Sequence, residues 1–178
     1  SSAVTMEGMF GSFNGSSASI DISNFSLAKV ENMSKMFMGF KDEFDTNGCG
    51  DSYGIADITW PNLTVAPELK TLKSLFSHNC NIQKIKAPKI TAPKLTDISY
   101  AFANLGTVNT LDLDDFDTSN VENMEGLFAG NSSKFNTAYR AKISLNTSNV
   151  KNMSKLFHYT YVSYLDLSDL DVRKVTNF

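Results

Sequence analysis

The chain has 178 residues, 42% of them hydrophobic, and a formal net charge of −3, which suits one soluble domain able to build a core. Its Lys and Arg residues are scattered along the sequence, which argues against a nucleic-acid-binding surface. No apolar run approaches the roughly 20 residues that cross a bilayer, so the sequence predicts no transmembrane segment.

Short segments that alternate apolar and polar residues recur along the chain. They read IDISNF from Ile20, DITWPNL from Asp57, IKAPKI from Ile85, LDLDDF from Leu111, AKISLNT from Ala141 and LDLSDL from Leu165. Alternation over so few residues predicts a short strand with one buried face. We therefore expect each repeat to contain one such strand.

A second element, an octet of residues, follows about ten residues after the start of each strand segment. It reads VENMSKMF at 30–37, VENMEGLF at 121–128 and VKNMSKLF at 150–157, with weaker copies between. Its apolar residues fall at i, i+3, i+6 and i+7, which predicts a helix of about two turns. Ser119 and Glu122 have capping-box spacing and would mark the start of one helix.

The last residue of each octet sets the repeat length. These residues are Phe10, Phe37, Phe76, Phe102, Phe128 and Phe157, separated by 27, 39, 26, 26 and 29 residues. One strand–turn–helix unit of this size cannot bury its apolar face alone, so the units must stack. The sequence predicts an α/β fold: a leucine-rich-repeat-like solenoid of short parallel strands and short helices, with about six repeats.

The repeats predict the domain organisation. We expect residues 1–178 to form a single repeat domain, with residues 41–56 as an inserted loop. Both ends of the chain fall inside a repeat, so we expect a fragment of a longer surface protein. Open ends of such a stack would also allow weak self-association.

The stretch LDLDDFDTSNVENMEGLFAG, residues 111–130, carries a family likeness. It resembles the BspA-like leucine-rich-repeat family of bacterial surface proteins, in the branch with the repeat L-D-L-S-N-F-D-T-S-x-V-T-N-M-x-x-M-F. The resemblance implies a secreted or cell-wall-anchored, extracellular protein, often an adhesin. It brings no catalytic residues and no cofactor, so we expect no enzyme.

The polar residues of the strand segments form the candidate binding face. Its residues are Asp21, Asp57, Thr59, Lys84, Lys86, Asp112, Lys142, Ser144, Tyr164 and Asp166. Extended strand-lined surfaces of stacked repeats commonly bind partners, here a host or bacterial surface protein or a glycan. The alternatives are a merely solvated strand face and a passive spacer that projects other domains from the cell wall.

The remaining polar features have structural explanations. The recurring Asn32, Asn123, Asn152 and Asn177 share one octet position, where their amides would be neighbours and satisfy backbone groups. The acidic run 112–117 is best explained as solvated carboxylates, and His78 and His158 lack a recognisable catalytic motif. Cys49 and Cys80 either form one disulfide, which would suit an oxidising environment, or remain two buried thiols.

Overall fold

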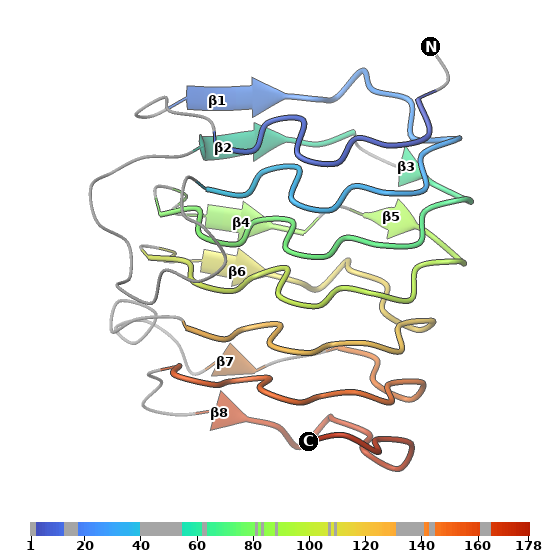
Figure 1. Cartoon of the computed structure of the whole chain (residues 1–178), viewed down its shortest axis with the longest axis vertical. Coiled ribbons are helices and arrows are strands. Elements are labelled where there is room, and N and C mark those ends of the chain that lie inside the picture. Colours follow the sequence, from blue (N-terminus) through green and yellow to red (C-terminus); the bar gives the residue numbers. More distant parts are fainter. Residues whose placement is uncertain are drawn as a thin grey trace.

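The computed structural model describes residues 3–12, 18–39, 55–61, 64–80, 82, 84–87, 89–106, 108, 110–130, 141–142, 145–160 and 165–178. Its strands are β1 (Ala18–Asp21), β2 (Ile55–Thr59), β3 (Thr64–Val65), β4 (Lys84–Lys86), β5 (Ile90–Thr91), β6 (Thr110–Asp112), β7 (Ala141–Lys142) and β8 (Leu165–Asp166). They pair in parallel as β1–β2, β3–β5, β4–β6 and β7–β8. Each pair joins strands from successive repeats, so the repeats lie one above another as rungs (Figure 1).

The octets form a second ladder. Parallel bridges connect equivalent residues of successive octets, in the order Thr5, Asn32, Thr71, Asp97, Asn123, Asn152 and Asn177. Each rung thus runs along a strand wall, turns a corner and returns along an octet wall. We call these two surfaces the strand face and the octet face.

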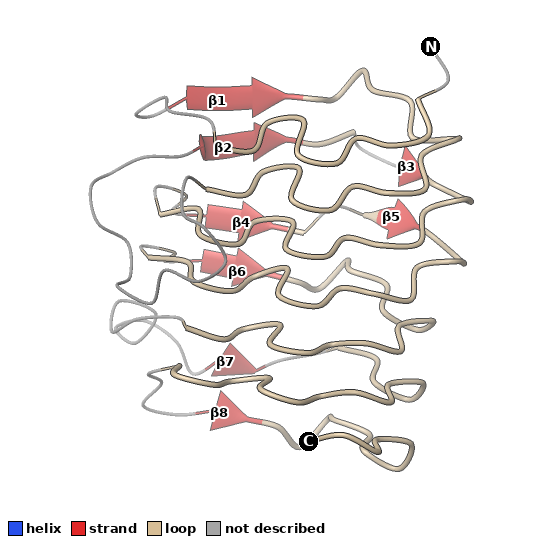
Figure 2. Ribbon diagram, viewed as in Figure 1, coloured by secondary structure: helices blue, strands red, loops and turns tan. Residues whose placement is uncertain are grey.

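The predicted α/β class with short helices is wrong. Within the described residues the rungs consist of strands, bends and turns, with no helix, and Figure 2 shows only strands and loops. The backbone amides explain the difference. Those of Lys35 and Phe37 donate across the stack to the carbonyls of Lys73 and Leu75, both at 2.9 Å. An α-helix would direct every such amide to the carbonyl four residues earlier in its own segment.

The alternate amides close tight turns within the octet. The amide of Met36 donates to the Met33 carbonyl at 3.3 Å, with Lys35 at a φ of 57° in the turn. A turn with positive φ at its third residue is of type II. The same octet position has positive φ in successive rungs, at Gly8, Lys35, Ser74, Tyr100, Gly126 and Lys155. Apolar residues three apart therefore point inward because of successive turns, not because of a helix.

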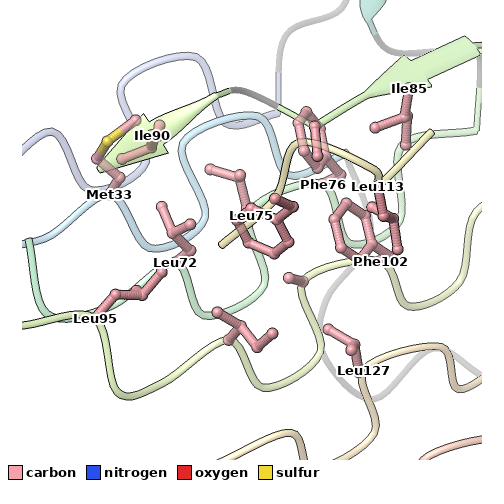
Figure 3. Close-up of a cluster of buried hydrophobic side chains, with 14 of the residues drawn as sticks. Met33, Leu72, Leu75, Phe76, Ile85, Ile90, Leu95, Phe102, Leu113 and Leu127 are labelled. Carbon is pink, nitrogen blue, oxygen red and sulfur yellow. The ribbon is translucent and has the colours of Figure 1, made fainter. Parts of the chain in front are cut away.

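The core is a column of aromatic rings between the two walls. The terminal phenylalanines of successive octets stack nearly parallel, with centroids 5.5 to 5.9 Å apart from Phe10 to Phe157. Trp60 meets Phe37 and Phe76 edge-on from the strand side. Figure 3 shows how Leu72, Leu75, Ile85 and other aliphatic side chains surround this column. Burying each large apolar side chain contributes about 1.5–3 kcal/mol to the stability of the fold.

Polar side chains hold the rung corners. The fully buried Thr118 hydroxyl donates to the Asn146 carbonyl of the next rung at 2.9 Å, and Thr147 repeats the contact with Asp171 at 3.0 Å. Just before the first Thr, the Asp117 carboxylate accepts the Ser119 amide at 2.9 Å. These contacts explain the recurring Asp/Asn-Thr-Ser sequence. The predicted capping box is therefore wrong, because Ser119 belongs to this corner turn and Glu122 pairs with Lys151.

The octet ladder confirms the role predicted for its asparagines. Asn32, Asn123 and Asn152 each accept the amide of the residue two positions later, at 2.8 to 3.1 Å. Thr71 and Asp97 make the equivalent contact in their own rungs. The side chain at this position therefore starts the octet turns while its backbone bridges neighbouring rungs.

The proposed insertion is only partly described. Residues 41–54 lie outside the described part of the chain, and residues 55 and 56 begin β2. Where the structure is described, it has no helix long and apolar enough to span a membrane.

Candidate functional site

The candidate binding face lies on the strands, where alternate side chains face the solvent. Asp21, Asp57, Thr59, Lys84 and Lys86 are exposed, and the buried Ile85 between the two lysines points into the core. Asp112 and Asp166 are partly exposed. Ser144 and Tyr164 lie outside the described residues, and only the backbone of Lys142 is described.

The register decides which of these residues are neighbours. Asp21 pairs with Thr59, and Asp57 pairs with Ser19. Lys86 pairs with Asp112, and Lys142 pairs with Asp166. Strand spacing alone would place Asp21 beside Asp57 and Ser144 beside Asp166, and the structure differs by one alternation in each case. Lys86 and Asp112 are therefore neighbours on the strand face, as are Lys142 and Asp166.

Most acids of the strand face stabilise the turn that follows their strand. Asp21, Asp112 and Asp166 each accept the amide two residues later, at 2.8, 3.1 and 3.0 Å. A hydrogen bond from the Ser23 side chain, followed by the one from its backbone amide, lowers the pKa of Asp21. The second carboxylate oxygen of Asp112 lies 3.9 Å from the Lys86 ammonium nitrogen. The acidic run 112–117 is thus built from turn caps and ion pairs, since Asp115 also meets Lys89 at 3.5 Å.

A narrow slot interrupts the strand face between β2 and β4. These strands belong to different sheets, and the slot between them has a volume of about 90 Å³. Asp57, Lys84 and Lys86 line it together with Trp60. The structure therefore brings three of the predicted face residues together around an aromatic side chain. The sequence analysis did not include Trp60 among the candidate binding residues. Its position at the end of a strand segment could have indicated that it lies beside them.

The octet face carries a polar cluster that the repeat pattern did not reveal. Tyr100 donates its hydroxyl to Glu125 at 2.7 Å, and Lys155 donates to the same carboxylate oxygen at 3.1 Å. Partial burial, followed by the hydrogen bond to Glu125, raises the pKa of Tyr100. The hydrogen bond from Tyr100 lowers the pKa of Glu125 despite some burial. The cluster thus holds a protonated phenol and an ionised carboxylate at neutral pH.

The structure describes the two residues of a possible catalytic pair, Ser77 and His78, but only one of the two cysteines. The buried Ser77 hydroxyl lies 2.8 Å from Nδ1 of His78, the next residue in the chain. Cys80 is disulfide-bonded. Cys49 lies outside the described residues, so its pairing with Cys80 stays a prediction. Within the described residues no group of three or more His, Cys, Asp or Glu side chains could hold a metal ion.

The rungs, their parallel ladders and their polar faces define the class: a repeat-type bacterial protein built from stacked short strands and turns. The chain belongs to the family described as "Mycoplasma protein of unknown function, DUF285", whose model matches residues 1–51 and 70–178. This membership is consistent with a BspA-like repeat protein at the level of the family. Among curated proteins and solved structures, none matches the chain.

Proposed function

We propose that this chain is a binding module of a bacterial surface protein, which holds a partner protein or glycan on its strand face. The observation that carries the proposal is the exposed basic pair Lys84 and Lys86, placed between acidic side chains of the neighbouring rungs. Such a pattern of charges recognises a partner with complementary charges in one register. The adhesin branch of the BspA-like family would use the module in this way.

The proposed location is extracellular, either secreted or anchored to the cell wall. The disulfide at Cys80 supports it, because disulfides persist mainly in oxidising environments. The family resemblance brings no catalytic residues, so the proposal is of binding and not of catalysis.

A passive spacer is the second candidate, and one observation favours it. Charged side chains of successive rungs pair with each other, as Lys70 does with Glu31 and Lys94 with Glu68 at 2.6 Å. Charges used in this way support the stack and leave fewer groups for a partner. A spacer would bind nothing saturably on either face.

The test is a binding screen of the folded chain against an array of extracellular-matrix proteins and glycans. A charge-reversed variant, Lys84→Glu with Lys86→Glu, runs in parallel. The matched control reverses two exposed lysines at the rung corners, Lys29 and Lys174, to Glu. Saturable binding that survives in the control and is lost in the strand-face variant supports the proposal. Absence of saturable binding across the array favours the spacer.

A neutralised variant refines the result. Asp21→Asn and Asp166→Asn keep an oxygen that accepts the turn amide, so the strand ends stay capped while two charges disappear. If these acids contact the partner, its affinity falls without a change in melting temperature. An unchanged affinity would restrict the site to the basic pair and the slot beside Trp60.

A further inference from the structure

The octet face has a hollow of about 380 Å³, at the lower end of the usual size of small-molecule sites. Its lining includes Lys73, Ser74, His78, Tyr100, Asn104 and Lys155. With Met38, which also lines it, the hollow draws on three successive rungs and on the rung of Lys155, two rungs farther along. The hollow lies on the other wall from the strand face, so it is a separate site.

Two glycines shape the hollow. A Cβ at Gly126 would lie 2.2 Å from Cε1 of Tyr100, and a Cβ at Gly130 would lie 1.9 Å from Oδ1 of Asn104. The Tyr100 ring and the Asn104 amide therefore lie over the next rung, in the space that side chains at positions 126 and 130 would fill. On the rung before, the position equivalent to Tyr100 is the small, buried Ser74. The result is a step in the octet face, with Tyr100 and Asn104 as its raised side.

Ordered polar groups line this step. The Tyr100 hydroxyl and the Lys155 ammonium are both held by Glu125, at 2.7 and 3.1 Å. The Ser77 hydroxyl lies 2.8 Å from Nδ1 of His78 at the bottom. Groups fixed in the absence of a ligand lose little conformational entropy when they bind one.

The charge of the hollow is positive. Among the described residues its lining contains two lysines and no carboxylate. Glu125 beside it offsets the charge of Lys155, whereas Lys73 is exposed and makes no ion pair within the described part of the chain. An ammonium group without a carboxylate partner, at the rim of a hollow, favours an anionic ligand.

We propose that this hollow binds a carboxylated monosaccharide unit. Lys73 pairs with the carboxylate, while the hydroxyl, amide and imidazole groups of the lining exchange hydrogen bonds with the sugar hydroxyls. The volume admits one pyranose ring, and the side of the Tyr100 ring supplies apolar surface for its carbon face. A phosphate would gain less here, because only one of the two lysines lacks a carboxylate partner.

The experiment titrates the isotope-labelled chain with sodium glucuronate at low ionic strength and follows the backbone amides by NMR. Glucose tests the need for charge, and acetate tests the need for the ring. We expect saturable shifts at Ser74, Ser77 and Asn104 with glucuronate, and at least about tenfold weaker binding of glucose and acetate. Equal binding of glucose, or no saturation by about 50 mM glucuronate, overturns the proposal.

Two substitutions place the site. Lys73→Gln removes the charge and keeps the side-chain length, and its matched control is Lys29→Gln, at an exposed rung corner. We expect the dissociation constant for glucuronate to rise at least about tenfold in the first and to stay unchanged in the second, with equal melting temperatures. An unchanged constant in Lys73→Gln places the sugar elsewhere and refutes the inference. The strand-face variants leave this titration unchanged, so the two sites are tested separately.

Discussion

Replacing Gly126 by Ala tests how the octet face is built. The residue has a φ of 56°, which an alanine adopts at a cost of about 1–2 kcal/mol. Its new Cβ would also lie 2.2 Å from the Tyr100 ring, which must swing away. That movement breaks the hydrogen bond from Tyr100 to Glu125, worth about 1 kcal/mol at this partly exposed site. We expect a total loss of about 2–3 kcal/mol in the free energy of unfolding.

Gly8 provides the matched control. It occupies the same octet position with a φ of 61°, and a Cβ there has no described atom within 4 Å. Gly8→Ala therefore carries only the backbone cost of about 1–2 kcal/mol. Urea unfolding, followed by the fluorescence of Trp60 between Phe37 and Phe76, measures both variants.

The Tyr100→Ser background completes a double-mutant cycle. Serine already stands at the equivalent position of the previous rung, as Ser74, so the octet tolerates it. In this background Gly126→Ala should cost only the backbone part, and the coupling between the two sites should be about 1 kcal/mol. A loss of the same size in both backgrounds would refute the reasoning, because it would mean that the Tyr100 ring does not lie over Gly126.

Three further predictions follow from other contacts. Gly39→Ala should destabilise the chain by about 3 kcal/mol in urea unfolding, because its Cβ would lie 1.7 Å from the backbone oxygen of His78, which cannot swing away as a side chain can. Thr118→Val should cost about 1–2 kcal/mol by leaving a carbonyl of the next rung without its donor, whereas Thr118→Ser should retain the hydrogen bond and most of the stability. NMR titration should find a pKa of about 2 for Asp171, because Arg173 donates to its carboxylate, and Arg173→Gln should raise it. Folding lowers the pKa of Asp171, so its contribution to stability is complete above the unfolded pKa of about 4 and is lost as the pH falls toward 2. An unshifted pKa for Asp171 would contradict its contact with Arg173.

Part of the fold could be predicted from the repeats. The terminal phenylalanines were expected at equivalent positions of a stack, and their rings do form one continuous column. The shared asparagine position was expected to satisfy backbone groups at the start of each octet, and Asn123 does so by accepting the Glu125 amide. Both predictions succeeded because each concerns one residue type that recurs at one position.

The helix prediction failed because the apolar pattern of the octet fits both a helix and a series of tight turns. Apolar residues at i, i+3 and i+6 face one side of a helix, and they also face one side of successive tight turns. Lys35 and Tyr100 show which is present, since each has a positive φ that no helix interior allows. Nothing in either residue type requires that conformation, so only contacts with neighbouring rungs select it.

The binding role of the candidate face stays a prediction, and only the exposure and register of its residues can be compared with the structure. Alternation correctly places Lys84 and Lys86 in the solvent. The register of Asp57 beside Ser19 could not be read from spacing, because β2 carries one extra residue, Ala56, opposite the step from Ala18 to Ser19. A shift of one residue moves a strand side chain to the other face, so small irregularities decide which charges meet.

The sequence by itself determined the repeat length, the buried residues of each rung and the polar residues that cap its turns. These features depend on residue type and on spacing within one repeat, which are local. The tertiary structure alone decided that the octets are turns, that Tyr100 lies over Gly126, and which charges of the strand face are neighbours. The physical reason is that many octet amides find their acceptors in neighbouring rungs, those of Met33, Lys35 and Phe37 in the next rung and that of Glu31 in the previous one. The conformation of each repeat is therefore settled only when its neighbours are in place.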